Sequence, residues 1–243
     1  MRKFGLIGAS LEHSFSKKYF TEKFQKEGII DCQYDLYELN PETNFREWLL
    51  NSGLEGVNVT IPYKEKVMDH LDQISDSARE IGAVNTIHID NGSLKGHNTD
   101  ALGFAKSIKP FFASHHERAM ILGTGGASKA IKYVLDQLGV RCLRVSRAGS
   151  GMNQVAYEEL HSEGMRFWPM IVNCTPLGTF PNVEECPNIP YEGITSQHFC
   201  VDLVYNPAET EFMKRSKAKG ATVMNGLDML IHQAEGAWKI WNS

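Results

Sequence analysis

Polar side chains gather in four short clusters at the ends of predicted strands. The clusters are Ser14-Phe15-Ser16, Asn58-Val59-Thr60-Ile61-Pro62-Tyr63-Lys64, Asn85-Thr86 and Asn98-Thr99-Asp100. Hydroxyl, amide, ammonium and carboxylate groups together can bind a small polar molecule and move a proton on it. Each cluster alone also has a structural explanation, because Ser16 or Asp100 could cap a helix and Lys64 could be solvated in a first helical turn. Spacing alone leaves both interpretations open.

A glycine-rich turn follows the apolar run 119–122 and has the residue types of a phosphate-binding loop. It reads Gly123-Thr124-Gly125-Gly126-Ala127-Ser128, and a helical pattern over 127–138 and a strand over 140–146 come after it. Glycines let the backbone approach a pyrophosphate, which the N–H groups and dipole of the helix N-terminus then bind. A glycine triplet alone also occurs in tight turns without a ligand. The complete strand–turn–helix–strand unit favours a dinucleotide site.

The end of the second strand indicates which dinucleotide binds. Sites for NAD usually carry an Asp or Glu about 20 residues after the turn, where it binds the ribose 2′-hydroxyl. The matching stretch here is Val145-Ser146-Arg147, which contains no acid. A hydroxyl and a guanidinium suit a 2′-phosphate, so the sequence favours NADP. The alternative is that Arg147 is simply an exposed residue where the strand ends.

Short β-rich runs alternate with amphipathic helical patterns along the chain. Strands are predicted over 3–8, 33–39, 56–61, 83–90, 119–123, 140–146, 169–174, 199–204 and 222–224. Helices are predicted over 16–26, 44–51, 63–71, 77–81, 101–112, 127–138, 209–219 and 227–241. This alternation is typical of an α/β protein with mostly parallel sheets. Asn91-Gly92 instead predicts a tight hairpin turn before a run over 93–97.

A boundary between two domains is predicted near residue 100. A long helical pattern follows the hairpin there, and the polar joint Ser114-His115-His116-Glu117-Arg118 then leads into a new strand. We expect a second α/β domain from this joint to residue 224. The pattern does not decide which domain the final helix packs on.

Composition restricts the class of protein. The chain has 243 residues, 42% hydrophobic and 22% charged, with a formal net charge of −4. These are globular proportions, with no basic footprint for nucleic acid and no apolar run near the roughly 20 residues of a membrane helix. The N-terminal apolar stretch is too short for a signal peptide, and five scattered cysteines indicate a reduced, cytoplasmic protein. The nine histidines lack metal-site spacing, so we expect no metal.

Taken together, the motifs resemble those of the shikimate dehydrogenase family. The earlier clusters read in family order as Ser14-x-Ser16, Asn58-Val59-Thr60-x-Pro62-x-Lys64, Gly82-Ala83-x-Asn85-Thr86, Asn98-Thr99-Asp100 and Gly123-x-Gly125-Gly126-Ala127. Further motifs are Asn173-Cys174-Thr175-Pro176-Leu177-Gly178, Asp202-Leu203-Val204-Tyr205-Asn206-Pro207 and Asn225-Gly226-Leu227-x-Met229-Leu230-x-x-Gln233-Ala234. The resemblance covers nearly the whole chain. It implies two α/β domains with an active-site cleft between them: a substrate-binding and catalytic domain of residues 1–100 plus 225–243, and a Rossmann-like NADP-binding domain of residues 101–224.

The resemblance also implies roles for individual residues, with Lys64 and Asp100 as the catalytic pair. The residues expected to contact shikimate are Ser14, Ser16, Thr60, Lys64, Asn85, Asp100, Tyr205 and Gln233. The residues expected to line the cofactor are Gly123, Gly125, Gly126, Ala127, Ser146, Arg147, Thr175, Val204, Gly226 and Met229. Two positions depart from the family pattern. Thr179 stands where Met is usual, and Gly151 stands where a second basic residue often supports the 2′-phosphate.

The residue types suit the reaction that the resemblance implies, which is the reversible NADPH-dependent reduction of 3-dehydroshikimate to shikimate on the route to chorismate and aromatic amino acids. Hydride transfer to a ketone leaves an alkoxide that must be protonated, and the reverse reaction needs a base at the same atom. Lys64 can serve in both directions while Asp100 holds and orients it. Ser14 and Ser16 are expected to bind the carboxylate of shikimate. The side chains expected to bind its ring hydroxyls are Thr60, Asn85, Asp100 and Gln233.

Three other functions are considered against this one. A quinate/shikimate dehydrogenase with looser substrate choice and NAD use is disfavoured by the lack of an acid at Ser146 or Arg147. A non-catalytic sensor would not need both Lys64 and Asp100, and a scaffold protein would not need polar residues gathered at strand ends. We therefore expect an enzyme that acts on a small molecule, as a monomer or homodimer, without nucleic-acid or membrane partners.

Overall fold

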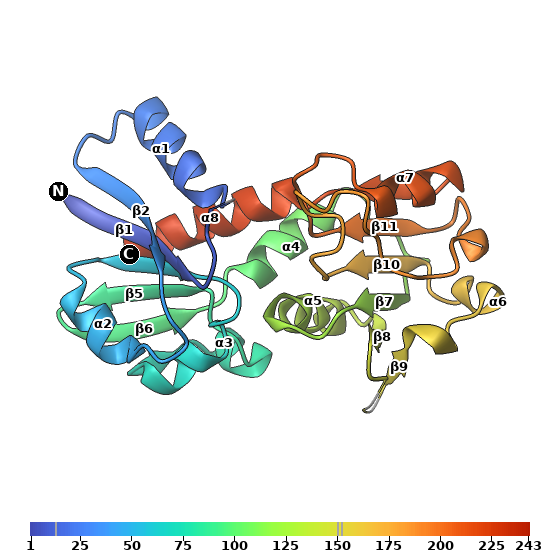
Figure 1. Ribbon diagram of the computed structural model, residues 1–243, viewed down its shortest axis with the longest axis horizontal. Helices are drawn as coiled ribbons and strands as arrows, with labels where there is room; N and C mark the ends of the chain where they lie inside the picture. The colour runs from blue at the N-terminus through green and yellow to red at the C-terminus, as the bar shows by residue number, and fades with distance from the viewer. Residues whose placement is uncertain (13, 150, 152) are drawn as a thin grey trace. The chain divides into compact units, whose positions relative to one another are not determined.

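The computed structural model describes residues 1–12, 14–149, 151 and 153–243. The chain forms two compact units, Met1–Leu102 with Ile231–Ser243, and Gly103–Leu230. Each unit is built on one six-stranded sheet with helices packed on it (Figure 1). The predicted α/β fold with two domains is therefore confirmed. Among the described residues, no helix combines the length and the apolar character that crossing a membrane requires.

The sheet of the first unit is mixed, with strand order β2-β1-β3-β5-β6-β4. Its strands are β1 (Arg2–Gly8), β2 (Cys32–Glu38), β3 (Gly56–Val59), β4 (Gln73–Ile74), β5 (Thr86–Asp90) and β6 (Ser93–His97). β1 runs parallel to β2 and β3, whereas β5 runs antiparallel to β3 and β6. Asn91 and Gly92 join β5 to β6 with φ angles of 48° and 79°. Positive φ at both positions suits a tight two-residue turn, so the predicted hairpin is confirmed.

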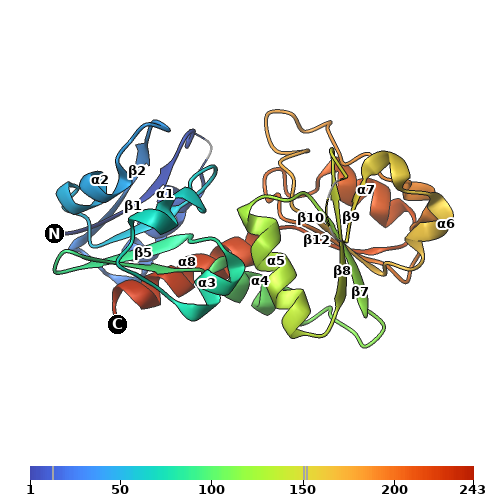
Figure 2. The ribbon, with the colours of Figure 1, turned by 90° about the horizontal axis from the view of Figure 1, so that it is seen from below.

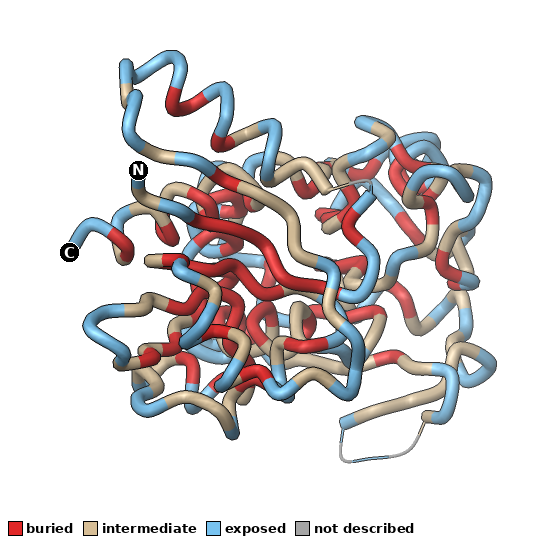
Figure 3. The backbone as a smooth tube through the Cα atoms, turned by 60° about the vertical axis from the view of Figure 1, so that its left-hand side comes forward, coloured by how far each residue is buried: buried red, intermediate tan, exposed pale blue. Residues whose placement is uncertain are grey.

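Helices cover both faces of this first sheet. They are α1 (Ser16–Glu27), α2 (Phe45–Asn51), the 3₁₀ helix η1 (Lys66–His70), α3 (Asp76–Ile81), the start of α4 (Asp100–Ile108) and the end of α8 (Leu227–Trp241). Successive residues of a strand point to opposite faces. Phe4 and Leu6 of β1 therefore pack with α1 and α8, while Ile7 packs with α2 and α3. Figure 3 shows the buried stretch of β1 shortly after the N-terminus.

The end of α8 completes the core of the first unit. Trp241 stacks on Phe4 with ring centroids 4.9 Å apart, and its indole N–H donates to the carbonyl oxygen of Ile87 at 3.0 Å. The indole also covers Gly56, where a Cβ atom would lie 2.3 Å from the ring. A larger residue at position 56 would displace Trp241 from its place in the core.

The sheet of the second unit has parallel pairings throughout, with strand order β12-β11-β10-β7-β8-β9. Its strands are β7 (Arg118–Leu122), β8 (Arg141–Ser146), β9 (Gln154–Ala156), β10 (Met170–Asn173), β11 (Phe199–Asp202) and β12 (Thr222–Met224). Its other elements are α5 (Gly126–Gln137), α6 (Ser162–Met165), α7 (Glu211–Ala218) and the 3₁₀ helices η2 (Tyr157–Glu159) and η3 (Tyr191–Gly193). Figure 2 shows α5 on one side of this sheet and α6 and α7 on the other. Helices on both faces explain why β10 and β11 are buried along their whole length.

Several local features differ from the sequence prediction. The pattern over 63–71 forms a turn followed by η1, so Lys64 lies in the turn and not in a helix. The strand predicted from residue 83 begins only at Thr86, because the N–H groups of Val84 and Asn85 donate to Lys64 and His97 outside the ladder with β3. The strands β4 and β9 were not predicted, since two or three residues are too few to show an alternating pattern.

Candidate functional site

The first unit holds the two predicted catalytic side chains in contact. Lys64 lies in the turn before η1, and Asp100 is the first residue of α4. The Nζ of Lys64 donates to Oδ2 of Asp100 at 2.6 Å, and the two side chains are only 15% and 8% exposed. Hydrogen bonds between ionised groups are shorter and stronger than neutral ones. A pair this buried is stable only when other polar groups complete its hydrogen bonding.

Asn85 supplies one of those groups, and a backbone N–H fixes its orientation. Its Oδ1 accepts from the N–H of Thr99 at 2.7 Å, so its Nδ2 faces Asp100. The Nδ2 donates to Oδ1 of Asp100 at 2.8 Å and lies 3.5 Å from Oε1 of Gln233. Asp100 thus accepts one hydrogen bond on each carboxylate oxygen, which holds Oδ2 toward Lys64.

A chain of buried hydrogen bonds leads from Asn85 to Tyr34. The Oγ1 of Thr86 donates to Oδ1 of Asn85 at 3.0 Å and accepts from Nδ2 of Asn58 at 3.3 Å. The Oδ1 of Asn58 in turn accepts from the hydroxyl of Tyr34 at 2.9 Å. Burial raises the pKa of Tyr34, against a smaller opposing effect of Ser16. These hydrogen bonds therefore connect Tyr34 with the groups that hold Lys64 and Asp100.

The structure removes two of the structural explanations considered for the polar clusters. The N-cap residue of α1 is Phe15, and Ser16 is already the first residue of the helix, so Ser16 is not a helix cap. Helix α4 is capped by Asn98, whose Oδ1 accepts from the N–H of Ala101 at 3.2 Å. The carboxylate of Asp100 is therefore not used for capping.

Ser14 and Thr60 lie at the ends of chain segments in the same unit. The Oγ of Ser14 accepts from the N–H of Ser16 at 3.3 Å, and both serines are half-buried. Thr60 follows β3, and its N–H donates to the carbonyl oxygen of Ile7 at 2.9 Å. Six of the predicted substrate residues, together with Lys64, thus belong to the first unit. They are Ser14, Ser16, Thr60, Asn85, Asp100 and Gln233.

In the second unit, the glycine-rich turn fits a pyrophosphate group. Gly123 has a φ of +107°, and a Cβ atom there would lie 3.3 Å from the side chain of Thr175. Gly125 is the N-cap residue of α5, and a Cβ atom there would meet no described atom within 4 Å. The first turn of α5, which contains Gly126 and Ala127, carries no acidic residue. An uncapped helix N-terminus beside open space is suited to bind an anion.

The end of β8 carries the two residues predicted to bind the 2′-phosphate. Ser146 is the last residue of β8, and Arg147 is exposed directly after it. The Oγ of Ser146 accepts from the N–H of Gly149 at 3.2 Å and from Nε2 of Gln154 at 2.7 Å. Gln154 comes from β9, an element that the sequence did not reveal.

Asp202, the last residue of β11, is the centre of a buried network at the carboxyl edge of the second sheet. Its Oδ1 accepts from Nδ2 of Asn173 at 2.9 Å and from the N–H of Val204 at 3.0 Å. Its Oδ2 accepts from the hydroxyl of Thr210 at 2.6 Å. The Oδ1 of Asn173 accepts from the N–H and the hydroxyl of Thr175 at 3.0 and 2.6 Å. The network therefore fixes the segments that carry Thr175 and Val204, two predicted cofactor-lining residues.

This network makes a testable prediction about stability and pH. Burial raises the pKa of Asp202 from its ordinary value of 3.8 to about 6, against the opposing effect of its hydrogen bonds. The folded protein therefore keeps this proton at pH values where the unfolded chain has lost it, and the free energy of unfolding falls as pH rises from about 4 to 6. Asp202→Asn removes this titration. The free energy of unfolding of the variant minus that of the natural chain should therefore rise by up to roughly 3 kcal/mol as the pH rises from about 4 to 6.

Urea denaturation of both proteins at pH 4, 5, 6 and 7 measures the difference directly. If the difference in free energy of unfolding between the two proteins is the same at all four pH values, Asp202 ionises normally in the folded protein.

Gly226 packs closely against the segment that follows β11. Its N–H donates to the carbonyl oxygen of Val204 at 3.0 Å, and a Cβ atom there would lie 2.1 Å from the carbonyl oxygen of Leu203. Any other residue would force these two segments apart. Tyr205 directly follows Val204, and Met229 is buried in the first turn of α8. The predicted cofactor-lining residues Val204 and Gly226 are thus held together.

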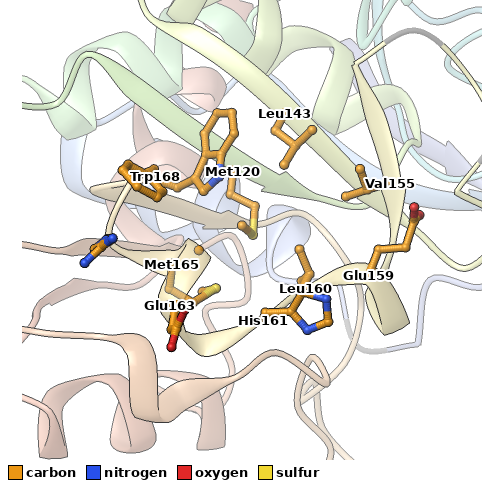
Figure 4. Close-up of a pocket in the computed structure, with 12 residues that line it drawn as sticks. Met120, Leu143, Val155, Glu159, Leu160, His161, Glu163, Met165 and Trp168 are labelled. Atoms are coloured by element: carbon orange, nitrogen blue, oxygen red, sulfur yellow. The ribbon is translucent and has the colours of Figure 1, made fainter.

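A pocket of about 370 Å³ lies on a different part of the second unit (Figure 4). Its walls come from β7, β8, β9 and residues 159–168, with Met120, Leu143 and Trp168 among the side chains that line it. None of its lining residues is one of the predicted site residues. In the described part of the chain, no group of three or more His, Cys, Asp or Glu side chains could hold a metal ion.

Similarity to known proteins decides the family. Residues 6–87 match the model of the shikimate dehydrogenase substrate binding domain. The shikimate dehydrogenase (NADP(+)) of Clostridium perfringens is 39% identical over 255 residues, which cover 100% of this chain and 93% of that protein. The chain belongs to the shikimate dehydrogenase family. It is an oxidoreductase, an NADP-dependent shikimate dehydrogenase, as the motifs predicted.

Solved structures of shikimate dehydrogenase relatives share the fold over the full length. The shikimate 5-dehydrogenase of Thermus thermophilus, solved with NADP(H) and shikimate, is 30% identical with a TM-score of 0.87, and the match covers 99% of this chain and 93% of that one. The quinate dehydrogenase of Corynebacterium glutamicum, solved with NAD, is 27% identical with a TM-score of 0.85 and the same coverage of both chains.

Sequence reasoning did not find two polar residues of this shikimate dehydrogenase, Tyr34 and Gln154. The alternation of β2 places Tyr34 on its inner face, and a buried tyrosine hydroxyl usually has a hydrogen-bond partner. That signal could have pointed to a polar partner such as Asn58. Gln154 gave no such signal, because its contact with Ser146 depends on the pairing of β8 with β9.

Proposed function

We propose that Lys64 and Asp100 carry out proton transfer in the shikimate dehydrogenase reaction, in a substrate-binding and catalytic domain made of residues 1–100 plus 225–243. The observation that carries this proposal is the buried ion pair of 2.6 Å, oriented by the hydrogen bond from Asn85. A bound cofactor would supply the redox chemistry, as NADP+ for removal of the hydride from shikimate and as NADPH for its return. In the oxidation of shikimate, Lys64 in its neutral form takes the proton of the reacting hydroxyl. In the reverse reaction, the ammonium of Lys64 returns a proton to that oxygen.

Side chains of the first unit suit a small carboxylated triol. Ser14 and Ser16 lie together at the start of α1, and we assign them to the carboxylate of shikimate. The hydroxyl, amide and carboxylate groups assigned to the ring hydroxyls are those of Thr60, Asn85, Asp100 and Gln233. Tyr205 is also assigned to the substrate. The relative from Thermus thermophilus, solved with shikimate, supports this substrate for the chain.

Residues 101–224 form the proposed NADP-binding domain. Gly226 and Met229, from the segment 225–243, are also assigned to the cofactor. The residues assigned to the cofactor are Gly123, Gly125, Gly126, Ala127, Ser146, Arg147, Thr175, Val204, Gly226 and Met229. The open N-terminus of α5 supports the pyrophosphate position, and the exposed Arg147 supports the 2′-phosphate position. Because Gly151 has no side chain, Arg147 acts without a second cation at that position.

Initial rates with shikimate and with quinate, each against NADP+ and NAD+, test the proposed specificity. We expect the highest kcat/KM for shikimate with NADP+. The second candidate is quinate oxidation with NAD+, which the relative from Corynebacterium glutamicum favours. A kcat/KM for quinate with NAD+ that equals or exceeds that for shikimate with NADP+ would make this second function the correct one.

We further propose that the enzyme works in the cytoplasm as a monomer or homodimer. All five cysteines are free, which agrees with a reducing compartment. Light scattering of the purified protein measures the number of chains in each particle, and a tetramer or larger assembly would contradict the proposal.

Replacing Arg147 with Ala tests the 2′-phosphate position. A hydrogen bond to a charged group contributes about 1.5–3 kcal/mol, so KM for NADP+ should rise roughly tenfold to a hundredfold. KM for NAD+ should stay nearly constant, because NAD+ has no 2′-phosphate.

Arg141→Ala is the matched control, since Arg141 is an exposed arginine at the opposite end of the same strand. It should leave both KM values unchanged. An equal rise of KM for NADP+ and for NAD+ in Arg147→Ala would show that Arg147 does not bind the 2′-phosphate.

A further inference from the structure

The strand β9 places one polar side chain against the end of β8. The two strands pair in parallel, with Arg144 opposite Gln154 and Ser146 opposite Ala156. From this position Gln154 reaches forward along the sheet, and its Nε2 donates to the Oγ of Ser146 at 2.7 Å. The N–H of Gly149 donates to the same oxygen at 3.2 Å.

These two contacts determine what the hydroxyl of Ser146 can offer to a ligand. A serine hydroxyl has two lone pairs that accept and one proton that it donates. Gln154 and Gly149 occupy both lone pairs. The hydroxyl is therefore left with its proton alone, and it can act toward a ligand only as a donor.

The residue at position 151 leaves room for this orientation of the Gln154 amide. Its Oε1 points toward Gly151, where an added Cβ atom would lie 3.2 Å from that oxygen. Gly151 also has a φ of +135°, which favours glycine. The absence of a side chain at position 151 thus leaves room for the Gln154 amide.

A donor-only hydroxyl distinguishes the two nicotinamide dinucleotides. The oxygens of a 2′-phosphate accept hydrogen bonds, whereas the ribose 2′-hydroxyl of NAD is usually bound by a carboxylate that accepts from it. We propose that Gln154 is a specificity-determining residue, which fixes Ser146 as a donor to the 2′-phosphate of NADP in place of a second basic side chain. This inference rests on the proposed contact between Ser146 and the cofactor.

Binding of two nucleotide fragments tests the proposal without turnover. Adenosine 2′,5′-bisphosphate and adenosine 5′-monophosphate differ only in the 2′-phosphate, so the ratio of their Kd values, measured by calorimetry, isolates its recognition. Gln154→Leu removes the donor without adding charge and should reduce the preference for the bisphosphate about two- to tenfold. Gln154→Glu keeps the shape but accepts the proton of Ser146. It should reduce the preference about tenfold to a hundredfold.

Three further variants separate the possible causes. Gln137→Leu changes an exposed glutamine at the end of α5 and should leave the ratio unchanged. Ser146→Ala should reduce the ratio by itself. When Gln154→Leu is added to Ser146→Ala, no further loss is expected, because Gln154 acts through Ser146.

The outcomes distinguish this inference from the proposed site. If Ser146→Ala reduces the ratio and neither Gln154 variant does, the role of Gln154 is wrong and the cofactor contact of Ser146 stands. If Ser146→Ala leaves the ratio unchanged, the cofactor contact is itself wrong and the inference fails with it. If the loss from Gln154→Leu persists in the Ser146→Ala background, Gln154 does not act through Ser146.

Discussion

Replacing Lys64 with Ala should lower kcat by roughly two to four orders of magnitude, because a positioned side chain that transfers a proton contributes about 10²–10⁴-fold. The Nζ of Lys64 is the group that Asp100 holds at 2.6 Å, and alanine leaves no group at that place to donate or accept the proton. KM for shikimate should change only modestly, since the serines and amides assigned to binding stay in place. Steady-state kinetics in the direction of shikimate oxidation measure both constants.

Lys66→Ala provides the control for this first prediction. Lys66 is an exposed lysine two residues further along, at the start of η1. Its replacement should leave kcat unchanged. A Lys64→Ala enzyme with near-natural kcat would rule out Lys64 as the proton-transfer group.

Asp100→Asn should also lower kcat strongly, by about tenfold to a hundredfold, as expected for the loss of a hydrogen bond between charged groups. Asparagine has the shape of aspartate, and its Oδ1 can still accept from Asn85. Its Nδ2 would then face Nζ of Lys64, which places a donor against a donor and leaves the ammonium without its carboxylate. Lys64 would lose its orientation even though the fold stays intact.

This second prediction also separates catalysis from helix capping. Asparagine caps helices about as well as aspartate does, so a purely capping role would leave activity intact. The structure assigns the cap of α4 to Asn98. Asp76→Asn, which changes an exposed carboxylate in the first turn of α3, should keep full activity. Equal kcat values for Asp100→Asn and Asp76→Asn would contradict the assigned role of Asp100.

The sequence predicted best the features that depend on neighbouring residues. The helical spacing after Gly126 predicted α5, since Ala130, Ile131 and Val134 face the core at intervals of three and four residues. Asn91-Gly92 predicted the hairpin, because these residues tolerate the positive φ angles that a two-residue turn needs. In both cases, residues that are close in the sequence determine the local structure.

Features that depend on distant contacts were not predictable in this way. Tyr34 and Asn58 are 24 residues apart, and only the completed sheet brings their side chains to 2.9 Å. The strand β9 exists because three residues pair with β8, and its intrinsic preference for extended structure is weak evidence by comparison. The motif resemblance identified site residues such as Asn85 and Ser146. The residues that hydrogen-bond within or to these networks, such as Tyr34 and Gln154, were identified only from the structure.

The position of Trp241 bears on the order in which the two units can form during synthesis on the ribosome. The second unit is one continuous stretch, Gly103–Leu230, whereas the first needs Ile231–Ser243 to be complete. Until α8 has been translated, Phe4 lacks the indole that stacks on it and Gly56 lacks its cover. The second unit can therefore reach its native structure before residues 231–243 have been translated, whereas the first unit cannot be completed until then. For this enzyme, the unit whose translation starts earlier is the one that is completed later.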